Sequence, residues 1–206
     1  LMITLADTFN RIAEKIDSDE SLMDWSPMQL SDSKDEKEQK AYWDSLRLDP
    51  KKFMFDILGV SKTWSGQDTM FKLLAENTKV GVASGHALGK DFASARAILW
   101  FLYTHIPATV IATAPTERQV EKVIWGELEE AYYRAHKALP GRLISKELTV
   151  DPKRRWYAIG FTTKDAHRSP GKFQGFHNRN VMVVFSEAQA IDRPIWEQSE
   201  SLMTAE

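Results

Sequence analysis

The feature that most constrains the fold of this 206-residue chain is the apolar run Val181–Phe185, with the sequence VMVVF. Five consecutive apolar residues without polar alternation are typical of a strand buried on both faces, as in parallel sheets covered by helices. No apolar segment of the chain reaches the roughly 20 residues that a membrane span needs. We therefore expect an α/β protein with helices on both sides of a mostly parallel sheet.

The region from residue 60 to residue 206 alternates between strand-like and helix-like segments. We expect strands at 79–84, 108–112 and 181–185, a hairpin formed by 148–151 and 156–161, and helices at 92–103 and 117–139. The second helix carries an apolar stripe at Val120, Ile124, Leu128, Ala131 and Ala135, which predicts core packing.

Residues 1–59 differ from this core. Leu5, Phe9, Ile12 and Ile16 recur at helical spacing, which predicts an amphipathic helix over residues 1–24, and a second apolar periodicity covers residues 42–58. We expect a helical N-terminal appendage or lid at 1–59 and a motif-bearing core at 60–206.

Composition excludes several classes of chemistry. The chain has no cysteine, so disulfides, thiolate zinc sites and a cysteine nucleophile are excluded. Between Arg142 and Arg179 there are nine Lys or Arg residues against three acidic ones. This stretch is compatible with a polyanionic partner, although a solvated face explains it more simply.

One segment has the pattern of a phosphate-binding loop: an expected strand, a glycine-containing turn ending in Gly-Lys, and an expected helix. Such loops work because backbone N–H groups and a helix N-terminus face an anion while a lysine reaches the terminal phosphates. The segment matches the usual pattern only at Gly89 and Lys90. It consists of Ser84, Gly85, His86, Ala87, Leu88, Gly89, Lys90 and Asp91.

A second motif follows the buried strand, where Phe185 is succeeded by Ser186 and Glu187. In phosphate-loop ATPases the corresponding strand delivers a metal-linked carboxylate and then a glutamate that orients the attacking water. Glu187 fits the second role. The metal-linked aspartate is replaced by Ser186, and the hydroxyl residue that usually follows the lysine is replaced by Asp91.

The two departures are complementary. If the strands before Ser84 and Ser186 lie adjacent, a magnesium ion would still meet one carboxylate, from Asp91, and one hydroxyl, from Ser186. We interpret the pair as a reciprocal swap that retains ATP and Mg²⁺ binding.

With these motifs, the sequence resembles the ATPase part of the large terminase subunit, the motor that packages DNA into the capsids of tailed phages. The resembling pieces are TWSGQDTM, SGHALGKD, ATAPTERQVEKVIWGEL, GKFQGFH and VVFSEAQAI, which span about residues 60–192. The resemblance implies a P-loop NTPase fold of the RecA-like (ASCE) type. It also implies a location in the cytoplasm of an infected bacterial host.

The resemblance also implies roles for single residues. Gln67 would bind the adenine and Trp64 would pack near it, the loop from Ser84 to Asp91 would hold the phosphates, and Glu187 and Lys90 would be catalytic. Many members of the family carry an arginine within the loop, whereas this chain has His86. Arg168, Arg179 or a neighbouring subunit would then supply the arginine function.

The implied partners are double-stranded DNA, the portal protein, the small terminase subunit and further copies in a ring on the procapsid. We expect no nuclease activity, because the acidic nuclease domain of the family would lie beyond Glu206. Two alternatives stay open at this point: a helicase-like ATPase acting on nucleic acid, favoured by TAPTERQV, and a nucleotide-binding scaffold impaired in hydrolysis, favoured by Asp91 and Ser186.

Overall fold

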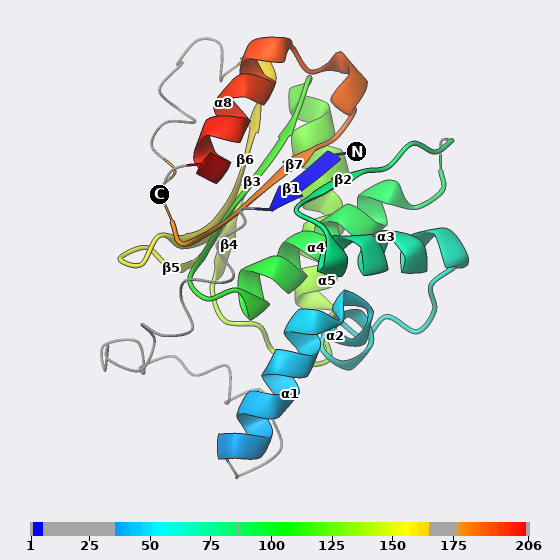
Figure 1. Cartoon of the computed structure of the whole chain (residues 1–206), viewed down its shortest axis with the longest axis vertical. Helices are drawn as coiled ribbons and strands as arrows, with labels where there is room; N and C mark the ends of the chain where they lie inside the picture. Colours follow the sequence, from blue (N-terminus) through cyan, green and yellow to red (C-terminus); the bar gives the residue numbers. More distant parts are fainter. Residues whose placement is uncertain (1, 6–35, 86, 165–175, 177, 205–206) are drawn as a thin grey trace.

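The computed structural model describes residues 2–5, 36–85, 87–164, 176 and 178–204. One seven-stranded sheet runs through it, with helices on both faces (Figure 1). The strands are β1 (Met2–Leu5), β2 (Lys79–Gly81), β3 (Ala108–Ala114), β4 (Arg142–Ile144), β5 (Glu147–Asp151), β6 (Trp156–Thr162) and β7 (Asn180–Phe185). Their order across the sheet is β2-β1-β7-β3-β6-β5-β4.

The sheet is mixed, which corrects the expectation of a mostly parallel one. Only β3 pairs in parallel, with β6 on one side and β7 on the other. The pairings β1–β2, β1–β7, β4–β5 and β5–β6 are antiparallel. The difference arises because the hairpin extends one edge of the sheet and an N-terminal strand enters near the other edge.

The main helices are α1 (Glu36–Leu48), α2 (Pro50–Asp56), α3 (Ser65–Glu76), α4 (Lys90–Thr104), α5 (Trp125–Tyr133) and α8 (Arg193–Thr204). A π-helical segment, η4 (Gln119–Ile124), leads into α5, and a short 3-10 turn, η5 (Ala188–Ala190), follows β7. None of the helices in the described ranges is long and apolar enough to cross a membrane.

Helix α4 forms the centre of the larger core, and its residues from Ala93 to Tyr103 are all buried. Two tryptophans tie the neighbouring elements to it through indole N–H groups, as is usual for buried tryptophan. Trp100 donates to the carbonyl oxygen of Leu46 in α1 at 2.9 Å, and Trp156 in β6 donates to that of Leu102 at 2.7 Å. Helices α1 and α4 therefore share one core.

A smaller core lies on the opposite face of the sheet, beneath α8 (Figure 1). There Ile195 of α8 is fully buried, and the ring centres of Trp196 and of Phe185 in β7 lie 4.3 Å apart. Because helices cover β7 on both faces, its residues 181–185 are all buried, as the apolar run predicts.

Most of the expected elements are present. The strands that begin at Lys79, Ala108 and near Val181 are confirmed, as are the hairpin and the helix that begins near Phe92. The helix predicted over 117–139 ends earlier, at Tyr133, and Ala135 lies beyond it. The helix predicted over 1–24 is wrong at Met2–Leu5, which forms β1, and its remainder lies outside the described residues. The boundary between residues 59 and 60 stays a prediction.

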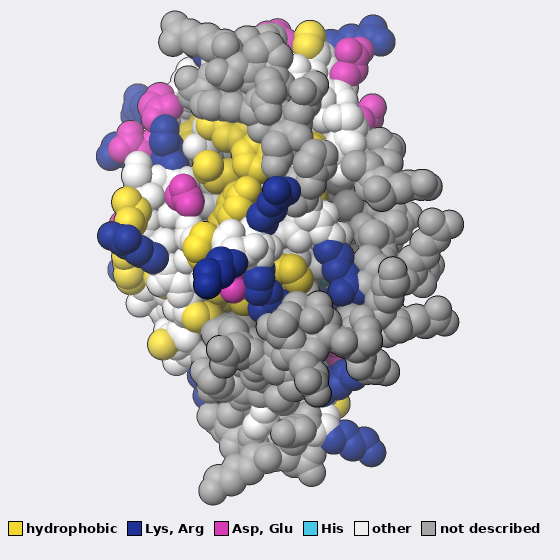
Figure 2. Space-filling view, turned by 90° about the vertical axis from the view of Figure 1, so that its left-hand side faces the viewer, with side chains coloured by type: hydrophobic (Ala, Val, Ile, Leu, Met, Phe, Trp, Pro, Cys, Tyr) yellow, Lys and Arg dark blue, Asp and Glu magenta, His cyan; other side chains and the backbone are white. Residues whose placement is uncertain are grey.

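The basic stretch contributes to the surface of the molecule. Lys153 and Arg155, in the turn between β5 and β6, are exposed. Figure 2 shows Lys and Arg side chains gathered beside apolar ones on one face. The exposure of Lys153 and Arg155 agrees with a solvated face, and a polyanionic partner for the basic stretch stays a prediction.

Candidate functional site

The sheet register places the two motif-bearing strands level with each other. Met2 of β1 pairs with Gly81 of β2 on one side and with Phe185 of β7 on the other. Strands β2 and β7 run in the same direction, because each is antiparallel to β1. Neighbouring strands lie about 4.8 Å apart, so the segments that follow β2 and β7 leave the sheet roughly 10 Å from each other. The loop with Lys90 and the segment with Glu187 therefore begin at the same edge of the sheet.

The loop after β2 is a tight, exposed turn that leads into α4. Gly89, the residue before α4, has φ 74°, and Ala87 has φ 57°, both in the left-handed region. The ammonium of Lys90 folds back over this turn. It donates to the carbonyl oxygens of Ser84 at 3.0 Å and Gly85 at 2.7 Å, and to the Ser84 hydroxyl at 3.2 Å. A lysine held over the loop in this way is placed to meet an anion bound there.

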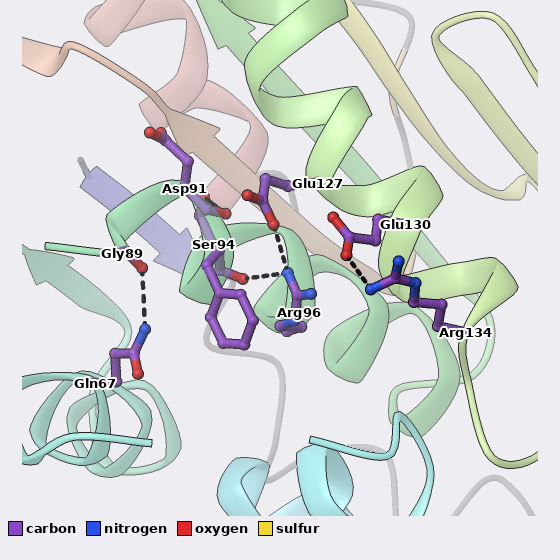
Figure 3. Close-up of polar contacts among 9 residues, drawn as sticks. Gln67, Gly89, Asp91, Ser94, Arg96, Glu127, Glu130 and Arg134 are labelled. Carbon is purple, nitrogen blue, oxygen red and sulfur yellow. Dashed lines mark hydrogen bonds and ion pairs between the residues drawn. The ribbon is translucent and has the colours of Figure 1, made fainter. Parts of the chain in front are cut away.

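The segment predicted to contact a nucleotide base lies against the same loop. Trp64 Nε1 donates to the carbonyl oxygen of Leu88 at 3.2 Å. Gln67 Nε2 donates to the carbonyl oxygen of Gly89 at 3.3 Å (Figure 3). The structure thus brings together Trp64, Gln67 and the phosphate-type loop, which are separate in the sequence.

Asp91, in the first turn of α4, has an unusual electrostatic environment. Partial burial raises the pKa of its carboxyl above the ordinary value of 3.8; Lys90 opposes this shift, and Glu187 and Glu127 add to it. No described residue donates a hydrogen bond to this carboxylate. Such a group is suited to a cation, which would favour its charged form.

Ser186 and Glu187 follow β7 directly. Ser186 is buried, and its backbone N–H donates to the carbonyl oxygen of Thr113 in β3 at 2.9 Å. Glu187 has φ 51°, a conformation that costs a residue with a side chain roughly 1–3 kcal/mol and that tends to occur at functional sites. Gln189 donates to the Glu187 carboxylate at 2.5 Å.

One condition of the proposed swap is wrong as stated. Strands β2 and β7 are not adjacent, because β1 lies between them. Within the described ranges, no three His, Cys, Asp or Glu side chains are grouped so that they could hold a metal. The donor set nevertheless suits Mg²⁺, which is usually bound through one or two carboxylates with substrate phosphates and water completing its shell. Asp91 would supply the carboxylate and Ser186 a hydroxyl.

The sequence reasoning missed a buried ion pair next to this site. Arg96 of α4 is 6% exposed, and its Nη1 donates to Glu127 of α5 at 2.9 Å (Figure 3). The Arg96 guanidinium also lies 3.4 Å from the centre of the Phe92 ring. Because the Glu127 charge also acts on Asp91, the pair belongs to the electrostatics of the site. Arg96 lies outside the quoted motifs, and Glu127 lies within ATAPTERQVEKVIWGEL but was assigned no role there.

The structure tests only one of the two arginines, Arg179 and Arg168, that were named as sources of the arginine function. Arg179 immediately precedes β7, whereas Glu187 follows it. Six residues of strand span about 20 Å, so Arg179 lies at the opposite edge of the sheet and is excluded as a source within the same chain. Arg168 lies outside the described residues, as does His86.

Comparisons of this chain with protein-family models, with curated proteins and with solved structures found no match. The interpretation of the site therefore depends on its own geometry.

Proposed function

We propose that this chain is a P-loop ATPase domain that hydrolyses ATP with Mg²⁺ and drives the packaging of double-stranded DNA, as in a large terminase subunit. The observation that carries the proposal is the register of Gly81 and Phe185 on either side of Met2. It supports a site in which a phosphate-binding loop faces a glutamate across a gap of one strand.

The loop residues would bind the phosphates. Lys90 donates three hydrogen bonds to neutral oxygens of its own loop, and an incoming phosphate would replace these with bonds to an anionic acceptor. The N-terminus of α4, a 15-residue helix, adds a positive partial charge at the same place. Both interactions strengthen as negative charge develops on the transferred phosphoryl group.

Asp91 and Ser186 would hold the magnesium ion, which when bound neutralises phosphate charge. Glu187 would orient the attacking water for in-line displacement of the terminal phosphate. The left-handed backbone of Glu187 turns the chain sharply after β7 and sets the direction in which its side chain leaves the backbone. The hydrogen bond from Gln189 would hold the carboxylate in one orientation.

The partners and setting of the motor are also part of the proposal. Double-stranded DNA would be the translocated substrate, in the cytoplasm of an infected bacterial host. The portal protein, the small terminase subunit and further copies of the chain in a ring would form the packaging assembly. Arg168 or an arginine from a neighbouring copy would supply the missing arginine function, since Arg179 lies at the opposite edge of the sheet from Glu187.

The proposal is tested by phosphate release from ATP with Mg²⁺, with the wild-type chain compared with Glu187→Gln. The amide keeps the size of the side chain but cannot act as a carboxylate toward water. We expect turnover to fall at least a hundredfold, the lower range for loss of a positioned acid–base group, while affinity for the nucleotide changes less than threefold.

Glu197→Gln provides the matched control, because Glu197 is an exposed carboxylate in α8 that forms an ion pair with Arg193. It should leave turnover unchanged. Equal turnover by the wild type and Glu187→Gln would reject the proposed role of Glu187. Absence of magnesium-dependent turnover in the wild type would favour the scaffold alternative.

A further inference from the structure

We propose that Trp64 and Gln67 are positioning residues that act on a nucleotide through the phosphate loop, and that Gln67 does not read the base. We call the contacts of these two residues with Leu88 and Gly89 the loop latch. This inference rests on the proposed function, because it concerns how the same site selects its nucleotide.

The first line of support is that Gln67 uses both ends of its amide within the protein. Its Nε2 donates to the carbonyl oxygen of Gly89 at 3.3 Å (Figure 3), and its Oε1 accepts from the backbone N–H of Trp64 at 3.4 Å. The residue is 9% exposed. Reading an adenine needs one donor and one acceptor from such an amide. Gln67 would have to release both contacts to provide them.

The second line of support is the lack of space around the latch. A Cβ at Gly89 would lie 2.6 Å from Gln67 Nε2, and one at Gly66 would lie 2.1 Å from the Trp64 ring. The start of α3 and the end of the loop therefore touch at Gly89, while the Trp64 ring folds over Gly66 within the start of α3. This packing fits a contact that fixes the loop, because glycine is needed where chain segments approach this closely.

The latch also lies where it can set the loop geometry. The carbonyl oxygens of Leu88 and Gly89 belong to the last two peptide groups before Lys90. Trp64 and Gln67 each donate a hydrogen bond to one of these carbonyl oxygens and so fix the orientation of that peptide group. The N–H groups of the same peptides, which would face an anion at the start of α4, are then fixed as well. Loss of the latch should thus weaken the binding of any phosphate-bearing ligand, whatever its base.

A consequence for specificity follows. If Gln67 acts only through the loop, its replacement changes affinity for ATP and GTP by the same factor. If Gln67 reads the base, Gln67→Ala should weaken ATP selectively. Gln67→Glu should then favour GTP, because a carboxylate accepts from the donors on the guanine edge.

The experiment has two arms, and each compares the latch variants Gln67→Ala, Gln67→Glu and Trp64→Phe with the control Lys72→Ala. Lys72 is a suitable control because it is an exposed residue of α3. The first arm measures hydrogen exchange of the loop amides, residues 84–91, without nucleotide. The second measures KM and kcat for ATP and GTP with Mg²⁺.

We expect the three latch variants to raise loop exchange and to raise KM for both nucleotides by about two- to tenfold, the range for losing one hydrogen bond. The ratio of kcat/KM for ATP to that for GTP should change less than twofold. Lys72→Ala should change neither quantity.

Unchanged loop exchange in Gln67→Ala, or a change of fivefold or more in the ATP-to-GTP ratio, would overturn the latch. Loss of all turnover in the wild type would reject the proposed function alone. The hydrogen-exchange measurement needs no nucleotide, so it would still show whether Trp64 and Gln67 restrain the loop.

Discussion

At the scale of single residues, Asp91 combines a cost in folding stability with its proposed role in holding the magnesium ion. Burial raises the pKa of its carboxyl, and Glu187 and Glu127 raise it further. A group whose pKa is higher in the folded chain than in the unfolded chain is most favourable to folding at low pH. Its contribution is complete below about pH 3.8 and is lost as the pH rises through the raised pKa.

Asp91→Asn should therefore make the protein more stable at neutral pH. We expect a gain of about 0.5–2 kcal/mol in the free energy of unfolding at pH 7, the usual range for stabilising substitutions. No gain should appear below about pH 3.8, where the aspartate is already protonated in both states. Urea unfolding at the two pH values measures this. A loss of stability at pH 7 would contradict the electrostatic account.

The residues of the site differ in how far the sequence predicts them. Lys90 and Glu187 follow strands that the apolar runs identify, so their places at one edge of the sheet could be predicted. The contacts of Gln67 with Gly89 could not be, because they depend on how α3 packs against a loop 22 positions away. Sequence patterns describe local structure, whereas such a contact is set by tertiary packing.

At the scale of elements, helices α4 and α5 are joined by a buried charge whose two partners are unequal. The side chain of Arg96 is 7% exposed, whereas that of Glu127 is 34% exposed. Burial lowers the pKa of Arg96, and Glu127 opposes this shift. Removal of one partner from a buried pair leaves the other charge uncompensated, and the cost depends on whether water can reach that charge.

Glu127→Ala should therefore destabilise the protein more than Arg96→Met does. The first substitution leaves a buried guanidinium without its carboxylate, and we expect a loss of about 2–4 kcal/mol. The second leaves a carboxylate that water can reach, and methionine fills part of the space, so we expect a loss of about 1 kcal/mol. Urea unfolding of both variants measures the difference. The reverse order would contradict the assigned burial of the pair.

The N-terminal strand β1 is the element that sequence reasoning predicted least well. Its four residues, MITL, are too few for their pattern to be distinguished from the start of an amphipathic helix. In the structure it pairs on both sides, with β2 and β7, so its conformation is determined by long-range pairing. Here tertiary contacts override the local pattern, as is common for short segments.

At the scale of the whole molecule, the site is assembled from segments far apart in the sequence. The loop follows β2, the glutamate follows β7, and a strand from the start of the chain separates them. Buried apolar runs indicated which strands are central, and this part of the architecture was predictable. The strand order, the mixed pairing and the gap between β2 and β7 were not, because the sequence records no pairing partner for an edge or a short strand.

The central claim is that the loop around Lys90 binds nucleotide phosphates together with Mg²⁺. Equilibrium titration with a fluorescent, slowly hydrolysed ATP analogue tests it most directly. We predict saturable binding to one site per chain that depends on Mg²⁺ and weakens at least tenfold in Lys90→Ala, since a charge-assisted hydrogen bond contributes about 1.5–3 kcal/mol. Affinity that is equal in the wild type and Lys90→Ala, or indifferent to Mg²⁺, would contradict it.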